Sequence, residues 1–242
     1  MTEEIWYLKQ CDLFRRLSAE QIARLEPGCR SRRFRRGEPV YLPDDAAEWG
    51  MVLAEGRVKI GSSTDDGKQT ILAFIEPGEL FGELDALDGE PRQEFAEAAE
   101  KSHVVLLPAG ALLDLIGSDA SLAAGVTKLI GLRRRRIERR LKSLLFRSNR
   151  QRLVSLLTEL AQQYGQPSVD PPGVRLAIKL SHQDIASLIG STRETVTIIL
   201  GELQNEGLLS IGRRRLVLTD LAALARAADG PIAAAPPTAE VL

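Results

Sequence analysis

The stretch from Ser181 to Leu203 constrains the fold most, because its residues suit two short helices joined by a tight turn. Ser181 and Asp184 form a variant of the capping box that starts a helix, and apolar residues then recur at helical spacing. Gly190 can adopt the positive φ that a tight turn needs. Ser191-Thr192 offers a second N-cap, again followed by apolar residues at helical spacing. This order of cap, helix, glycine and helix predicts a helix-turn-helix.

The polar residues of this stretch suit contacts with DNA. The second helix of a helix-turn-helix docks in the major groove by its N-terminal residues. There Arg193 can bridge O6 and N7 of a guanine, and Glu194 can accept from a cytosine amino group. Ser181, His182 and the first amides of the first helix can hold phosphate. The residues that we expect to contact DNA are Ser181, His182, Gln183, Ser191, Thr192, Arg193, Glu194 and Thr197.

The residues after this motif predict a wing. The run from Ile211 to Leu218 is typical of a hairpin, and Arg213, Arg214 and Arg215 form its basic tip. A simpler alternative is an ordinary helical hairpin whose charges are solvated. The order of cap, turn, base-reading pair and wing favours DNA binding.

The N-terminal part has the pattern of an antiparallel β structure. Between Arg30 and Leu107, brief apolar runs alternate with turns that contain glycine or proline, as in a sandwich or barrel. A helix is expected before them, over Leu8 to Leu25, with a capped start near Ser18. The expected strands contain Val40–Leu42, Gly50–Leu53, Val58–Ile60, Thr70–Ile75 and His103–Leu107.

A long helix is expected from Ser118 to Phe146, and a second over Gln151 to Tyr164. The first has a narrow apolar stripe, which is typical of a dimer seam, although burial against its own domain would give a similar stripe. A loop is expected over Gly165 to Gly173, which is too rich in proline for a helix or an inner strand. The stripe consists of Leu122, Val126, Leu129, Leu132, Ile137, Leu141 and Leu144.

Composition is that of an ordinary globular protein, with 44% hydrophobic and 27% charged residues. The N-terminus carries acids where a secretory signal carries basic residues, and no apolar run could span a bilayer. We therefore expect a cytoplasmic protein that has no membrane contact. The net charge of −1 hides an acidic N-terminal part and a basic connector, which suggests separate functions for them. Alanine and proline dominate Asp229 to Leu242, which we expect to be disordered.

Few residues suit catalysis or metal binding. Cys11 and Cys29 are the only cysteines, too few for an iron–sulfur cluster or a four-thiolate zinc site. They are expected to be packing or surface thiols. His103 lies in an apolar run, where a satisfied structural histidine is more common than a haem ligand. No Ser/His/Asp arrangement or phosphate-binding glycine loop occurs, so we expect no enzyme activity, no catalytic residue and no metal site.

Several segments resemble the CRP/FNR family of bacterial transcription regulators. Ser181–Ala186 and Gly190–Thr197 match its helix-turn-helix, while Arg33–Tyr41 and Pro77–Glu83 match its cyclic-nucleotide-binding β-roll. The resemblance implies an α+β fold with an antiparallel, jelly-roll-like β-roll, a long dimerisation helix and a C-terminal winged helix-turn-helix. It also implies a homodimer, a palindromic site on double-stranded DNA, RNA polymerase as a partner and an allosteric effector. The domains expected are 1–117 (cyclic-nucleotide-binding-like effector domain), 118–147 (dimerisation helix), 148–228 (DNA-binding domain) and 229–242 (disordered tail).

At the DNA-binding positions the resemblance assigns roles to single residues. Arg193 and Glu194 match the family's base-reading pair, and Ser181 and His182 match positions that contact the DNA backbone. Ile198 stands where the family's catabolite activator carries a further base-reading arginine. Since an aliphatic side chain can instead meet a thymine methyl group, Ile198 is also expected to contact DNA, at a different half-site.

The effector site departs further from the family. Gly82, Glu83 and Arg92 match positions that hold ribose and phosphate, and arginine can clamp a phosphate with two hydrogen bonds. Gln93 replaces a small hydroxyl residue, and Ile137-Glu138 replaces the Thr-Ser pair that contacts adenine. Cyclic AMP or another nucleotide is therefore one hypothesis for the effector. The effector-binding residues expected are Gly82, Glu83, Leu84, Arg92, Gln93, Ile137 and Glu138.

Two alternatives remain open for regulation. The altered effector positions favour a regulator of the same fold that needs no small molecule. The second alternative is a sensor of an anionic ligand such as a cyclic dinucleotide, which the basic block on the long helix could hold. The simpler interpretation of the block is that its side chains face solvent or the acidic β-roll, and direct contact with DNA is a further one. The block consists of Arg133–Arg136, Arg139, Arg140 and Lys142.

Overall fold

The computed structural model describes residues 3–15, 17–64, 69–212 and 215–228. The described chain forms two compact units that divide between Arg135 and Arg136, within one long helix. The expected tail from Asp229 to Leu242 and the wing-tip residues Arg213 and Arg214 lie outside the described residues.

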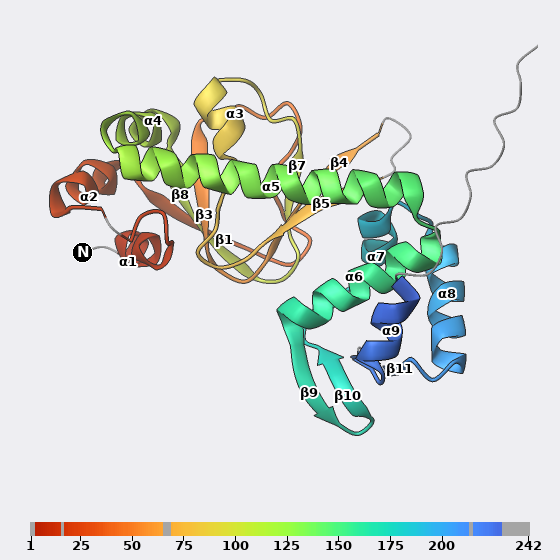
Figure 1. The fold of residues 1–242 in the computed structure, drawn as a ribbon. Helices are drawn as coiled ribbons and strands as arrows, with labels where there is room; N and C mark the ends of the chain where they lie inside the picture. Colours follow the sequence, from red (N-terminus) through yellow and green to blue (C-terminus); the bar gives the residue numbers. More distant parts are fainter. Residues whose placement is uncertain (1–2, 16, 65–68, 213–214, 229–242) are drawn as a thin grey trace, which may run out of the picture. The chain divides into compact units, whose positions relative to one another are not determined.

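The first unit contains an antiparallel β-roll (Figure 1). Its strands are β1 (Arg30–Phe34), β2 (Pro39–Tyr41), β3 (Trp49–Glu55), β4 (Val58–Ser63), β5 (Gln69–Ile75), β6 (Leu80–Phe81), β7 (Phe95–Ala98) and β8 (Ser102–Pro108). They form two four-stranded sheets, ordered β1-β8-β3-β6 and β2-β7-β4-β5. Residues of both sheets, among them Phe34, Leu53 and Ile75, share one buried core. The expected antiparallel fold is confirmed.

Three strands were not expected from the sequence. These are β1, β6 and β7. The first of them is almost wholly polar and exposed up to Phe34, so it shows no alternation of apolar residues. It is held instead by antiparallel pairing with β8, in which Arg30 lies opposite Leu106 and Phe34 opposite Ser102. Whether such a polar segment forms a strand therefore depends on a pairing partner far away in the sequence.

The N-terminal helices differ from the expectation of one helix over Leu8 to Leu25, which is wrong. The structure has α1 (Glu3–Gln10), α2 (Ala19–Leu25) and a short 3₁₀ helix η1 (Glu26–Gly28), with turns before Ser18. The capped start at Ser18 is confirmed. Its Oγ accepts from the Gln21 N–H at 3.2 Å, and its own N–H donates to Gln21 Oε1 at 2.7 Å. This capping box requires extended backbone at Ser18, so a helix cannot run through it.

The long helix α5 (Ala120–Phe146) begins at Asp119, which separates it from α4 (Ala109–Ser118). The Asp119 carboxylate accepts from the N–H groups of Ser121 and Leu122, as an N-cap does. Leu122 and Val126 are buried in a core shared with α1, α4 and β8, so the first part of the apolar stripe packs within its own unit. Among the described helices, none could cross a membrane alone by length and composition. Only α4 and α5 together pass that test, bent by 113°.

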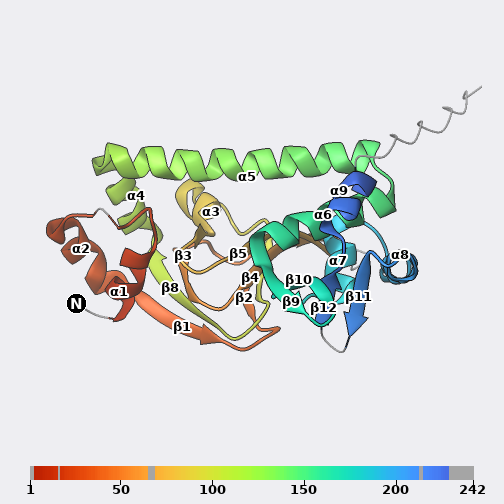
Figure 2. The same cartoon turned by 60° about the horizontal axis from the view of Figure 1, so that its bottom comes forward.

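The second unit includes the end of α5 from Arg136 and continues with further helices and one four-stranded sheet (Figure 2). Apolar faces of its helices contact one another, with Leu157, Val196 and Leu224 buried. The expected wing hairpin is confirmed as β11–β12, and the sheet order is β11-β12-β10-β9. The elements are α6 (Asn149–Tyr164), β9 (Gly165–Val169), β10 (Pro172–Leu176), α7 (His182–Ile189), α8 (Arg193–Asn205), β11 (Leu209–Gly212), β12 (Arg215–Leu218) and α9 (Leu221–Ala228).

The loop expected over Gly165 to Gly173 is wrong, because these residues belong to the hairpin β9–β10. Pro167 lies in β9, which is an edge strand, and Pro172 is the first residue of β10. At both kinds of position the missing N–H of proline is tolerated in a sheet. The proline content therefore restricted where the strands could lie without excluding them.

Candidate nucleic-acid interface and effector site

The two helices of the helix-turn-helix each begin at a side-chain cap. Ser181 Oγ accepts from the Asp184 N–H at 3.0 Å, and Asp184 Oδ2 accepts from the Ser181 N–H at 2.9 Å. Gly190 ends α7 with a φ of 63°, the left-handed conformation that glycine favours. Thr192 Oγ1 then accepts from the Thr195 N–H at 3.2 Å and starts α8. The predicted cap, turn and cap are confirmed.

The helix α8 has one buried and one exposed face. Val196, Ile199, Leu200 and Leu203 are buried against the rest of the unit. The exposed face presents Arg193, Glu194, Thr197 and Ile198. Ile198 is 63% exposed, so its side chain is accessible to a partner. The outward face of α8 therefore presents two charged side chains, one hydroxyl group and one aliphatic side chain.

The other expected DNA-binding residues lie beside this face. Ser181, His182 and Gln183 form the start of α7, and Ser191 and Thr192 lie in the turn. The His182 ring contacts Thr197 across the two helices through a hydrogen bond of 2.8 Å. In the wing, Arg215 Nη2 donates to Ser168 Oγ at 2.7 Å and to the carbonyl of Asp170, which ties it to the β9–β10 hairpin.

Arg92, one of the expected effector-binding residues, is buried at 2% exposure. Its Nη1 donates to the Gly82 carbonyl at 2.6 Å, and its Nη2 donates to the Trp49 carbonyl at 2.5 Å. Asp85 Oδ2 lies 3.6 Å from Nη1, and the Tyr41 ring centroid lies 4.6 Å from the guanidinium carbon. A buried charge is costly unless it is paired and hydrogen-bonded, so these groups stabilise it. The sequence pattern indicated none of Tyr41, Trp49 and Asp85 as partners.

Glu83 lies beside Arg92 and is also buried, at 1% exposure. Its Oε1 accepts from Arg133 Nη1 at 2.5 Å, and Arg133 Nη2 donates to the Leu80 carbonyl. Among the described residues, the second oxygen of Glu83, Oε2, has no hydrogen-bond partner, and neither does Nε of Arg92. Arg133 thus contacts the acidic β-roll.

Acidic groups outnumber basic ones around these two residues. Glu83, Asp85 and Glu94 face Arg92 and Arg133. Burial raises the pKa of Glu94, the neighbouring Asp85 carboxylate raises it further, and Arg133 opposes both effects. The charge of Arg92 is therefore balanced from within the protein.

The remaining expected effector residues are more exposed. Leu84 is exposed on α3 (Glu83–Asp88), and Gln93 is exposed with its Nε2 donating to the Pro91 carbonyl at 3.4 Å. Ile137 and Glu138 are exposed on the part of α5 that belongs to the second unit. The structure thus brings Arg92 into contact with Gly82, while the adjacent Glu83 binds Arg133.

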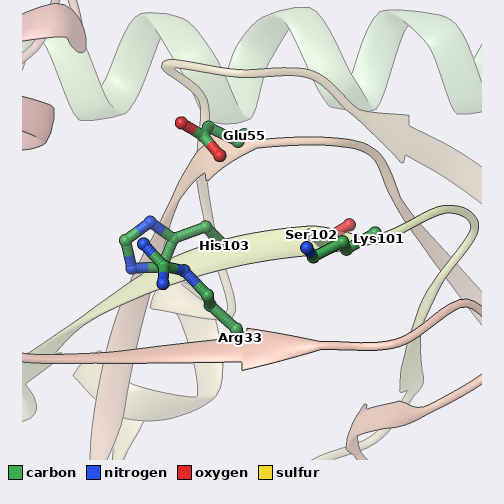
Figure 3. A pocket seen from close by; sticks show the side chains of 5 residues that line it. All are labelled: Arg33, Glu55, Lys101, Ser102 and His103. Carbon is green, nitrogen blue, oxygen red and sulfur yellow. The ribbon is translucent and has the colours of Figure 1, made fainter.

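A separate cavity of about 270 Å³ opens on the β-roll (Figure 3). Glu55, on its rim, accepts from the Tyr7 hydroxyl at 2.8 Å, which raises the pKa of Tyr7. Arg33 pairs with Glu3 at 3.4 Å. His103 is buried edge-on against Tyr7, as a structural histidine is, but its Nδ1 has no partner among the described residues. The cavity is lined by Arg33, Glu55, Lys101, Ser102 and His103.

Cysteine and metal chemistry add no further site within the described ranges. Burial raises the pKa of Cys11 and of Cys29 to about 11, so both thiols are protonated at neutral pH. No group of three His, Cys, Asp or Glu residues among those described could hold a metal ion.

Two family models match this chain. Residues 31–119 match the cyclic nucleotide-binding domain, and residues 151–227 match the Crp-like helix-turn-helix domain. The first match covers the β-roll from β1 to α4, and the second covers the second unit from α6 to α9.

Curated proteins and solved structures agree with these models. The chain is 32% identical to the global nitrogen regulator of Synechococcus elongatus over 80% of this chain and 87% of that protein. It is 27% identical to a CRP-like cAMP-activated global transcriptional regulator of Mycobacterium tuberculosis, over 91% of this chain and 98% of that one. Its fold resembles that of a CRP-family transcriptional regulator from Thermus thermophilus, with a TM-score of 0.71 and 31% identity over 83% and 98% of the two chains.

Proposed function

Because the chain belongs to the CRP/FNR family of DNA-binding transcription regulators, we propose that it reads DNA with the exposed face of α8. The observation that carries this is the capped helix-turn-helix with Arg193 and Glu194 exposed at the start of α8. Arg193 would bridge a guanine, Glu194 would accept from a cytosine, and Ile198 would meet a thymine methyl group. Backbone phosphates would be held by Ser181, His182, Gln183, Ser191 and Thr192, with Thr197 beside the base edges.

We propose that α5 forms the dimer interface. Its second part exposes large apolar side chains, of which Ile137 and Leu141 are each 54% exposed. Exposed apolar surface of this kind marks a contact with another protein, and a twofold dimer matches a palindromic DNA site. RNA polymerase is the further partner, and we assign the chain no catalytic step. The exposed apolar residues of α5 are Leu132, Ile137, Leu141, Leu144, Leu145 and Phe146.

Effector control through the β-roll is supported by the grouping of Gly82, Glu83 and Arg92. Cyclic AMP or another nucleotide would bind there, shift the α5 helices of the dimer and re-aim the α8 helices. The buried Glu83 Oε2 and Arg92 Nε, which lack partners within the described residues, are groups that a ligand could satisfy.

A second candidate is regulation without any small molecule. It is favoured by the internal pairing of Arg92 with Asp85 and of Glu83 with Arg133, which already balances these charges. Calorimetric titration with cyclic AMP, cyclic GMP and a cyclic dinucleotide separates the candidates. Saturable binding of any of these nucleotides excludes regulation without a small molecule. If a Glu83→Gln protein binds the nucleotide as well as the unaltered protein does, the site at Gly82, Glu83 and Arg92 is excluded.

Selection of bound duplexes from a random pool, followed by footprinting, tests DNA binding directly. We expect two inverted half-sites whose centres lie about 34 Å apart, one turn of DNA. Affinity should fall steeply as salt rises, because released counterions accompany each phosphate contact. A chain that enriches no sequence over the starting pool would overturn the proposed function.

A further inference from the structure

Two arginines from other helices hold the C-terminal end of α7. Arg140 Nη2 donates to the Ser187 carbonyl at 3.0 Å and to the Leu188 carbonyl. Arg152 Nη1, from α6, donates to the Ile189 carbonyl at 2.7 Å and to the Gly190 carbonyl at 3.3 Å. The last carbonyls of a helix have no partner within the helix. Here the guanidinium groups bind these four consecutive carbonyls, residues 187–190, from outside.

The charges also suit this position. A helix C-terminus carries a partial negative charge, so a nearby cation is stabilising. Burial lowers the pKa of Arg140, and Glu159 partly offsets this. Arg152 is fixed further by donation from Nη2 to Asn149 Oδ1 at 2.5 Å. The planar guanidinium binds several acceptors at once with less loss of side-chain freedom than a lysine would need.

An apolar contact accompanies Arg140. Leu144, one helical turn further along α5, lies against the turn at Gly190. A Cβ atom added at Gly190 would lie 2.8 Å from Leu144 Cδ2, closer than such atoms pack. Figure 1 shows α7 beside the C-terminal end of α5. The same face of α5 thus supplies a cation and a methyl group to the end of α7.

We infer that Arg140 is a positioning residue that fixes the angle of the recognition helix α8 against the dimer helix α5. This rests on the proposed function, in which α5 joins the two protomers and α8 reads DNA. Of the two arginines, only Arg140 lies on α5. In a dimer whose two α5 helices pack against each other, the angle between α5 and α8 in each protomer sets the distance between the two recognition helices. Arg140 would then determine which half-site spacing the dimer accepts.

A spacing series tests this. The duplex selected with the unaltered protein is resynthesised with its half-sites moved by one or two base pairs in either direction. We expect the unaltered dimer to prefer one spacing sharply. Arg140→Ala should weaken binding at that spacing by about tenfold and flatten the preference, because both carbonyl contacts are lost. Arg140→Lys should fall between, since it keeps the charge without the planar fork.

Arg136→Ala is the matched control, because it removes the same side chain one turn earlier on an exposed part of α5. It should leave the preferred spacing unchanged. Circular dichroism and light scattering confirm folding and dimerisation of each variant. If Arg140→Ala does not fold, Arg140→Lys gives the same comparison, since it keeps the charge and loses the planar fork that binds the two carbonyls.

An Arg140 variant that binds more weakly at every spacing in equal proportion would overturn the inference, because a merely stabilising residue would behave in this way. An unchanged profile would overturn it as well. If the unaltered protein selects no sequence at all, the proposed function fails instead, so the two failures are distinct.

Discussion

His182 Nδ1 lies 2.8 Å from Thr197 Oγ1, so the first residue of α7 is hydrogen-bonded to the outward face of α8. The Thr197 hydroxyl has one proton, which it donates to the Arg193 carbonyl at 2.9 Å. With the hydroxyl proton on that bond, Thr197 Oγ1 is the acceptor and His182 Nδ1 the donor in their contact. A residue expected to contact phosphate is thereby joined to the helix expected to read bases.

This contact predicts energetic coupling between the two side chains. Thr197→Val and His182→Ala should each lower the free energy of unfolding by about 0.5–1.5 kcal/mol, the usual contribution of one hydrogen bond. The double variant should lose less than the sum. Urea unfolding of all four proteins measures the difference. His182→Ala combined with Glu194→Ala provides the control pair, which should be additive; additivity in the His182–Thr197 pair would contradict the contact.

Arg193→Ala should remove sequence preference while leaving a folded dimer. Loss of one bidentate arginine–guanine contact lowers discrimination by about tenfold to a hundredfold. Fluorescence anisotropy with the selected duplex and a scrambled one gives the ratio. Arg226→Ala makes the same charge change on an exposed position of α9 and should keep that ratio. A footprint unchanged in Arg193→Ala would remove Arg193 from the base-reading set.

Leu141→Glu should convert the dimer to a monomer at micromolar concentration. The side chain is 54% exposed on one chain, and a carboxylate buried in an apolar interface would lack a partner. Light scattering coupled to size-exclusion chromatography reports the mass. Lys142→Glu places the same acid on the next, exposed residue and should remain dimeric. Two variants of equal mass would show that the interface lies elsewhere.

Glu94→Gln should stabilise the first unit at neutral pH. Burial raises the pKa of Glu94 in the folded protein, and the nearby Asp85 carboxylate raises it further, by a smaller amount. Its contribution to stability is therefore present below the unfolded value of about 4.3 and is lost as pH rises through the folded pKa. The melting temperature of Glu94→Gln should exceed that of the unaltered protein at about pH 7, and the two should converge near about pH 3.5. The exposed Glu90→Gln is the control, and an equal gain there would assign the effect to net charge.

The two thiols should react slowly in the folded protein. With the pKa values of Cys11 and Cys29 at about 11, about one thiol in a thousand is ionised at pH 8, and only the thiolate attacks a disulfide reagent. Reaction with a chromogenic aromatic disulfide should be slow before denaturation and rapid after it. A fast native phase would mean that one thiol is exposed and activated.

The sequence predicted what depends on neighbouring residues. Ser181, Gly190 and Thr192 mark the ends of the two short helices through contacts within a few positions, and the structure has those caps. The turns that contain glycine or proline likewise predicted where most of the strands of the β-roll begin and end.

Features that depend on distant partners were missed. The polar strand β1 is held by β8, and the hairpin β9–β10 by pairing that proline content alone does not reveal. The binding of α7 by Arg140 and Arg152 joins residues that no spacing rule connects. The basic block was interpreted as one group of side chains, whereas Arg133 and Arg140 bind different elements. The two arginines share a face of α5, but Arg140 lies about 10 Å further along the helix axis, so it meets other neighbours.

The proline within β9 has a consequence for how this chain behaves at high concentration. Edge strands can recruit a strand from another molecule, which begins aggregation. Pro167 removes one backbone donor from the middle of β9, and Val169 at its end is 90% exposed. Without that donor, an incoming strand cannot form a continuous ladder. The hairpin can therefore display an apolar tip in a crowded solution without becoming a template for self-association.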